Sequence, residues 1–76
     1  MDKMTTTQTI AEYFTTAKTG EIYRSVIDTT ERLLIEKALE CSLGNQLAAS
    51  RILGLNRNTL RTKIKKLCID TRRFKA

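Results

Sequence analysis

The apolar residues near the start of the chain recur at helical spacing. Ile10, Phe14 and Ala17 are four and three residues apart, which places them on one face of a helix. We expect this helix over residues 8–18 and expect Gly20 to lie in the turn that follows. The polar, threonine-rich residues before the helix predict a frayed lead.

A longer helix is predicted over residues 21–42, and its apolar arc is wider than one neighbouring helix can cover. A core-facing stripe needs three or four apolar residues in two turns, whereas this segment also carries a dense group from Leu33 to Leu39. We expect a second copy of the chain to cover the surplus. The predicted dimer core consists of Ile22, Val26, Ile27, Leu33, Leu34 and Ala38. Two alternatives are that helices of the same chain cover the arc and that Thr30 caps a new helix.

Two short helices follow, separated by a three-residue glycine turn. Gly44 predicts a left-handed helix end and Asn45 the N-cap of the next helix. We therefore expect one helix over residues 46–53 and, capped by Asn56, a last helix over residues 57–67. Two helices joined in this way predict a helix-turn-helix.

The packing positions of these two helices meet the steric demands of that motif. Ala49 and Ser50 are small enough for close approach, and Gly54 can adopt the positive φ of a sharp turn. The apolar side chains expected to fill the angle between the helices are Leu53, Leu55, Leu60, Ile64 and Leu67.

The outer face of the last helix carries the candidate chemistry. Arginine pairs with guanine and asparagine with adenine in the major groove, whereas lysine contacts phosphate without reading sequence. The predicted DNA-binding residues are Asn45, Asn56, Arg57, Asn58, Thr59, Arg61, Lys63, Lys65 and Lys66. The alternative is an ordinary helical hairpin with a solvated basic face.

Charge favours the nucleic-acid interpretation. The chain carries 14 basic and 8 acidic residues, a net charge of +6. After residue 43 there are nine basic residues and one acid, Asp70. Such asymmetry indicates a surface for a polyanion. With 76 residues, the chain has a marginal core of its own, which again favours a dimer.

Composition argues against several other classes of function. There is no histidine, and Cys41 and Cys68 match no zinc spacing, so no metal site is predicted. We expect both cysteines to be reduced, buried or half-buried apolar residues. The sequence has no signal peptide, no apolar run of about 20 residues and no assembled nucleophile and base. It therefore predicts no membrane partner, no enzyme, no cofactor and no small-molecule substrate.

The helix-turn-helix segment resembles the Fis-type module. The resemblance extends over residues 10–69 and rests mainly on three runs, GNQ at 44–46, GLNRNTLR at 54–61 and KIKK at 63–66. This module occurs in the nucleoid protein Fis and as the C-terminal DNA-binding domain of NtrC-type activators of sigma-54 promoters. The resemblance implies four helices, the first two interlocked with those of a second protomer, and two recognition helices that bend DNA.

The resemblance also implies roles for single residues. It implies DNA contacts for Asn45, Asn56, Arg57, Thr59, Arg61 and Lys63. Leu47 replaces a threonine near phosphate and Thr62 replaces a basic residue, which weakens the expected backbone contacts. The hairpin arm that Fis uses on recombinases has no room before Ile10, so no such role is expected.

The predicted fold is all-α, a four-helix homodimer-forming domain with a C-terminal helix-turn-helix. Its expected parts are a flexible lead (1–9), a helical dimerisation region (10–43), the helix-turn-helix DNA-binding region (44–67) and a basic tail (68–76). We expect the tail, with Arg72, Arg73 and Lys75, to be loose, whether it contacts flanking DNA or is disordered.

The leading functional hypothesis is a free-standing Fis-like homodimer, which the polar opening residues 1–4 favour. It would bind double-stranded DNA in the cytoplasm at the bacterial nucleoid, bend it, regulate transcription and contact RNA polymerase. The second hypothesis is the excised DNA-binding domain of an NtrC-type activator. A third is a dimeric adaptor for an acidic protein, which leaves Asn56 and Arg57 unexplained. A membrane-surface helix is disfavoured because the last helix lacks a broad apolar face.

Overall fold

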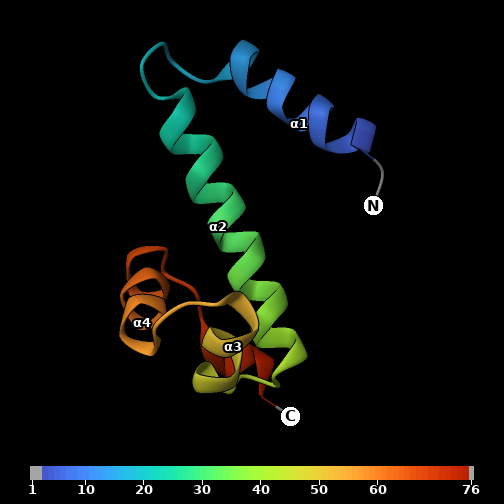
Figure 1. Ribbon diagram of the computed structural model, residues 1–76. Coiled ribbons are helices and arrows are strands. Elements are labelled where there is room, and N and C mark those ends of the chain that lie inside the picture. Colours follow the sequence, from blue (N-terminus) through green and yellow to red (C-terminus); the bar gives the residue numbers. More distant parts are fainter. Residues whose placement is uncertain (1–2, 76) are drawn as a thin grey trace.

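The computed structural model describes residues 3–75, all of whose regular elements are helical. They are α1 (Lys3–Thr16), α2 (Ile22–Cys41), α3 (Gln46–Leu53), α4 (Arg57–Lys66) and a 3₁₀ helix, η1 (Thr71–Phe74). In Figure 1, α1 and α2 form two arms joined at their adjacent ends, and α3, α4 and η1 gather around the far end of α2. The prediction of an all-α fold with a C-terminal helix-turn-helix is confirmed.

The core is formed by the C-terminal half of α2, by α3 and α4, and by the residues that follow α4. Its buried apolar residues are Ile35, Ala38, Leu39, Ala49, Leu60, Ile64, Leu67 and Ile69. Ala49 is 0% exposed and Ser50 2%, which confirms that small residues allow α3 to approach its neighbours closely. The Ser50 hydroxyl is not a buried orphan, because it donates a hydrogen bond to the Leu47 carbonyl at 2.7 Å.

Side-chain caps and left-handed residues set the boundaries of α3 and α4. The Asn45 side chain accepts from the Ala48 amide at 3.0 Å, and the Asn56 side chain accepts from the Asn58 amide at 2.8 Å. Gly54 follows α3 with φ of +73°, as a left-handed helix end requires. These local signals explain why the predicted start and end of α3 match the structure.

The left-handed residue at the end of α2 is Leu43 as well as the predicted Gly44. Their φ angles are +54° and +85°, and the Gly44 amide donates to the Leu39 carbonyl at 2.8 Å. The same geometry ends α4, where Cys68 has a φ of +56° and the next amide reaches back to the Ile64 carbonyl. Cys68 is itself the left-handed residue after α4 and Cys41 is the last residue of α2, and both are exposed. The prediction that the cysteines are buried or half-buried was wrong.

The N-terminal arm differs from the expectation in two respects. Helix α1 begins at Lys3 instead of residue 8, so the part of the predicted lead that the structure describes is helical. Once a helix is nucleated, each further residue adds one hydrogen bond, which lets a polar segment extend it. Helix α2 continues through Thr30 without a break, and the Tyr13 hydroxyl donates to Thr29 Oγ1 at 2.6 Å, linking the two arms. Residues 1 and 2 lie outside the described residues.

The basic tail is folded against α2, in contrast to the loose tail that we predicted. Ile69 is buried in the core, and Phe74 packs against the same cluster. Between them Asp70 caps η1, accepting a hydrogen bond from the Arg72 amide at 3.0 Å. This backbone bond and the Arg72 side chain lower the pKa of Asp70. Two apolar anchors on either side of a capped turn thus hold the segment in place.

No helix in residues 3–75 is both long and apolar enough to span a bilayer.

Candidate nucleic-acid interface

The outer face of α4 is an exposed polar surface. Leu60 and Ile64 turn inward to the core, which leaves the opposite side of the helix to solvent. A shallow hollow on that side is lined by Asn58, Arg61, Thr62 and Lys65. Helix α4 contains no acidic residue, so this face presents only donors and positive charge beside hydroxyls and amides.

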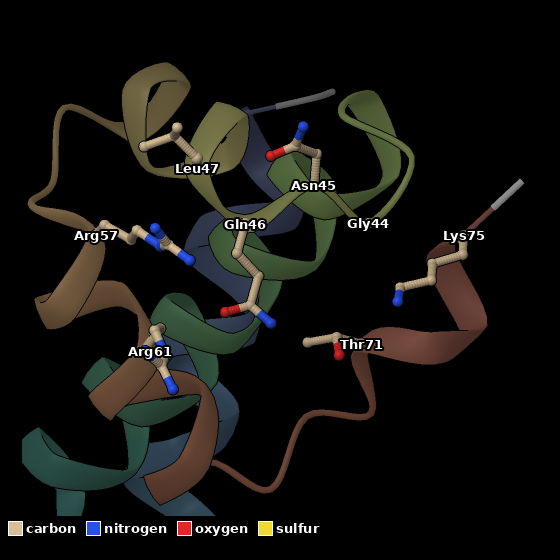
Figure 2. Close-up of a pocket in the computed structure, with 8 residues that line it drawn as sticks. All are labelled: Gly44, Asn45, Gln46, Leu47, Arg57, Arg61, Thr71 and Lys75. Atoms are coloured by element: carbon tan, nitrogen blue, oxygen red, sulfur yellow. The ribbon is translucent and has the colours of Figure 1, made fainter.

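A second, open depression of about 450 Å³ lies between the start of α3, the exposed side of α4 and the tail. Its lining residues are Gly44, Asn45, Gln46, Leu47, Arg57, Arg61, Thr71 and Lys75. Figure 2 shows Gln46 and Arg57 pointing toward its middle, with Arg61 along one side and Thr71 and Lys75 opposite. Arg61 lines both hollows, so the two form one continuous surface.

The two asparagine caps have a structural task at this surface. In both Asn45 and Asn56 the side-chain oxygen is engaged by a backbone amide at the start of the following helix. The side-chain amide nitrogen is the group that can still donate to a ligand. Helix capping therefore explains why asparagine occupies these two positions, and a DNA contact would be a second role of the same side chains.

Lys63 is separated from the other predicted DNA-binding residues. Its ammonium forms an ion pair with Glu31 of α2 at 2.5 Å, and only 32% of its side chain is exposed. This pair fixes α4 against α2 on the side away from the open surface. Among the remaining predicted residues, Asn58, Thr59, Lys65 and Lys66 are exposed on α4.

Four polar residues that line the two hollows were not among the predicted contacts: Gln46, Thr62, Thr71 and Lys75. Gln46 follows the Asn45 cap directly, so its position at a helix start was the one available signal. Thr71 and Lys75 reach the depression only because the tail folds back onto α2. No local pattern in the sequence indicates that the tail packs against α2.

The predicted dimer core is divided between two environments. Ile27, Leu33 and Leu34 are exposed, by 38%, 61% and 54%, and Ile22 and Val26 are half-buried. Ala38 is only 3% exposed because it belongs to the core that α2 shares with α3 and α4. Ala38 is thus covered within the single chain, whereas Ile27, Leu33 and Leu34 keep surface that a second copy could cover.

Comparison with known proteins adds evidence from outside this chain. The model of the family described as "Bacterial regulatory protein, Fis family" matches residues 26–67. The chain is also similar to proteins called "DNA-binding transcriptional regulator NtrC". The one from Azospirillum brasilense is 43% identical over 65 residues, and the one from Rhizobium meliloti (strain 1021) is 46% identical over 52 residues.

These alignments cover unequal shares of the two partners. They take in 80% and 68% of this chain but only 14% and 11% of the two regulators. The chain thus corresponds to a small part of the length of these relatives. No solved structure matches it significantly.

Proposed function

The chain belongs to the Fis family of bacterial regulatory proteins, and from this premise we propose that it binds double-stranded DNA with α4 in the major groove. The observation that carries the proposal is the continuous, acid-free surface formed by the exposed side of α4 and the adjoining depression. A helix enters the major groove with its N-terminal residues on base edges. A polyanion requires positive charge around that helix.

The residues at this surface divide by chemistry. Arg57 and Asn58, in the first turn of α4, are suited to base edges, arginine to guanine and asparagine to adenine. Lys65 and Lys66, in the last turn, are suited to phosphate. Thr59 can contact phosphate or a thymine methyl group. The short turn between α3 and α4 fixes both helices, so that bases and backbone are engaged together.

We further propose that the protein acts as a homodimer. The exposed apolar residues of α1 and α2 support this, since isolated monomers rarely leave so many large apolar side chains in water. Two recognition helices held by one dimer would bend the duplex between them. The biological role that follows is transcription regulation at the bacterial nucleoid, with RNA polymerase as a further partner.

The similarity to NtrC favours a second role equally. The chain is similar to a small part of these regulators, whose name states that they bind DNA and regulate transcription. On this alternative, the protein supplies the DNA-binding part of a sigma-54-dependent activator. Both roles use the same surface and differ in what is attached to it.

The deciding experiment is a fluorescence anisotropy titration with two duplexes, one of mixed sequence and one with an A/T-rich centre. Each titration is run at 50 mM and 200 mM salt. We expect two protomers per duplex, preference for the A/T-rich centre and a steep loss of affinity with salt. Absence of binding at the lower salt concentration would refute the DNA proposal and favour a dimeric adaptor for an acidic protein.

A further inference from the structure

We infer that η1 and the following Lys75 complete a binding site for one backbone phosphate of DNA. The inference rests on the proposed DNA-binding function and extends it to a part of the chain beyond residues 26–67, which the family model matches. It makes the tail a structured component of the interface, with a defined ligand, instead of a general source of positive charge.

The first support is the way in which the tail is held. Phe74 packs against the core, and Arg73 Nη2 lies 2.8 Å from Glu36 Oε2 of α2. The Arg73 guanidinium also lies 4.6 Å from the centre of the Phe74 ring. Because these contacts fix the residue immediately before Lys75, they also restrict where the lysine backbone can lie.

The second support is the close approach of Lys75 to Gly44. A Cβ atom added to Gly44 would lie 2.8 Å from Lys75 Cγ and 3.2 Å from its backbone nitrogen. Both distances are below ordinary contact, so only a glycine leaves room for the lysine at this point. Gly44 directly precedes the Asn45 cap of α3, and this contact therefore places Lys75 beside the start of that helix.

The third support is the distribution of ion pairs. Lys63, Arg72 and Arg73 each have a carboxylate within 4 Å, which neutralises them locally. Within residues 3–75, no carboxylate lies within ion-pairing distance of Arg61 or Lys75, which face the same depression. One charge of the tail, Lys75, and two charges of α4, Arg57 and Arg61, thus line the same hollow without a carboxylate partner among residues 3–75.

The donor set of the depression fits a phosphate. Arg61 and Lys75 provide charge from two elements, and the Thr71 hydroxyl and Gln46 amide provide neutral donors. The lining contains no acidic side chain. Charge-assisted hydrogen bonds of arginine and lysine to phosphate are among the stronger polar contacts available to a protein. When α4 lies in the major groove, the anion nearest to this depression is a phosphate of the DNA backbone beside that groove.

The test compares Lys75→Gln with Arg72→Gln by anisotropy titration over a series of salt concentrations. Both variants remove one positive charge from the tail, but Arg72 is paired with Asp70 and does not line the depression. For Lys75→Gln we expect a salt slope shallower by about 0.9 per bound protomer and affinity about five- to tenfold weaker per protomer at 0.1 M salt. For Arg72→Gln we expect a slope equal to that of the wild type.

A third variant separates position from charge. Phe74→Ala keeps every charge but removes the anchor, so it should lower the salt slope as Lys75→Gln does, while circular dichroism shows the helices intact. Equal effects of Lys75→Gln and Arg72→Gln would overturn the inference, as would a wild-type slope in Lys75→Gln or in folded Phe74→Ala. Lys65→Ala identifies which proposal fails: if it lowers the slope while Lys75→Gln does not, DNA binding stands and only the tail site is refuted.

Discussion

The basic residues that follow α2 have different tasks, and their immediate neighbours distinguish them. Lys63 and Arg73 bind carboxylates of α2 and so join α4 and η1 to the long helix. Arg57 and Lys65 lie on the open surface, and among residues 3–75 no carboxylate lies within ion-pairing distance of either. Net charge alone cannot separate these groups, because the sequence presents all of them as one basic run. Their effects on substitution should therefore differ.

Arg57 is the residue whose replacement should most affect sequence preference. We expect Arg57→Ala to cost about 1–3 kcal/mol on a preferred site and to reduce the difference between preferred and mixed duplexes. The reason is that an arginine in the first turn of a recognition helix can pair with guanine through two hydrogen bonds. Lys37→Ala is the control, since Lys37 lies on α2 and is paired with Glu40.

Because Arg57 also lines the depression, the measurement has a clear contrary result. A uniform loss of affinity for all sequences, together with a shallower salt slope, would assign Arg57 to phosphate and not to a base.

Lys63 and Lys65 provide a matched pair on one helix. Lys65→Ala should weaken binding to all sequences alike and reduce the salt slope by about one per bound protomer. Lys63→Ala should leave the slope unchanged and lower the midpoint of urea unfolding, because it leaves Glu31 without its partner. Salt-dependent titrations and urea curves on both variants check this. If both variants reduce the salt slope equally, Lys63 must leave Glu31 and contact DNA. If neither variant reduces it, the phosphate contact proposed for Lys65 is refuted.

At the scale of elements, the sequence predicts those boundaries that depend on neighbouring residues. Asn45, Gly54 and Asn56 act within one turn of chain, so the limits of α3 and the start of α4 follow from them directly. The docking of η1 depends instead on Arg73 and Glu36, which are 37 residues apart. No hydrophobic periodicity indicates that two residues so far apart are in contact. The sequence therefore predicts a loose basic segment for the tail. The same limit explains the missed contribution of Thr71 and Lys75 to the candidate site.

The turn between α3 and α4 can be tested through Gly54. Its φ is +73°, and an added Cβ would meet no atom within 4 Å, so substitution would cause backbone strain without a clash. We expect Gly54→Ala to destabilise the protein by about 1–2 kcal/mol, the cost of the left-handed region for an L-residue. Gly54→Asn should cost less, because asparagine tolerates this region. Urea unfolding of both variants measures the difference, and equal losses would indicate that something other than φ determines the residue here.

At the scale of the whole molecule, the buried apolar residues gather at one end, whereas no described side chain of α1 is buried, and Ile10 and Phe14 are exposed. The core lies around one face of the C-terminal half of α2, whereas α1 and the other face of α2 leave large apolar side chains in solvent. The exposed set on these two helices is Ile10, Phe14, Tyr23, Ile27, Leu33 and Leu34. The sequence predicts that the apolar arc of α2 is broad. It does not predict which residues of the arc face the core of the same chain and which stay exposed. Assigning Ala38 to the covered side requires knowing where α3 and α4 pack.

Leu34→Asp tests whether this exposed surface is where two copies meet. Leu34 is 54% exposed in the single chain, so a charge there can stay in water and leave the fold intact, whereas in a dimer core it would be buried without a partner. We expect sedimentation equilibrium to find a folded monomer for Leu34→Asp and a dimer for the wild type. Ile52→Asp is the matched control, because Ile52 is 58% exposed but lies on α3, outside the proposed interface.

The same two variants connect association to function. If both protomers must hold the duplex, the Leu34→Asp monomer should lose affinity for the preferred site while Ile52→Asp continues to dimerise. Two separate results would count against the dimer proposal: a wild type that sediments as a monomer, or a Leu34→Asp monomer that binds the site as tightly as the wild type. The second would mean that one helix-turn-helix suffices for recognition, and the exposed surface of α1 and α2 would then need a different partner to account for its apolar residues.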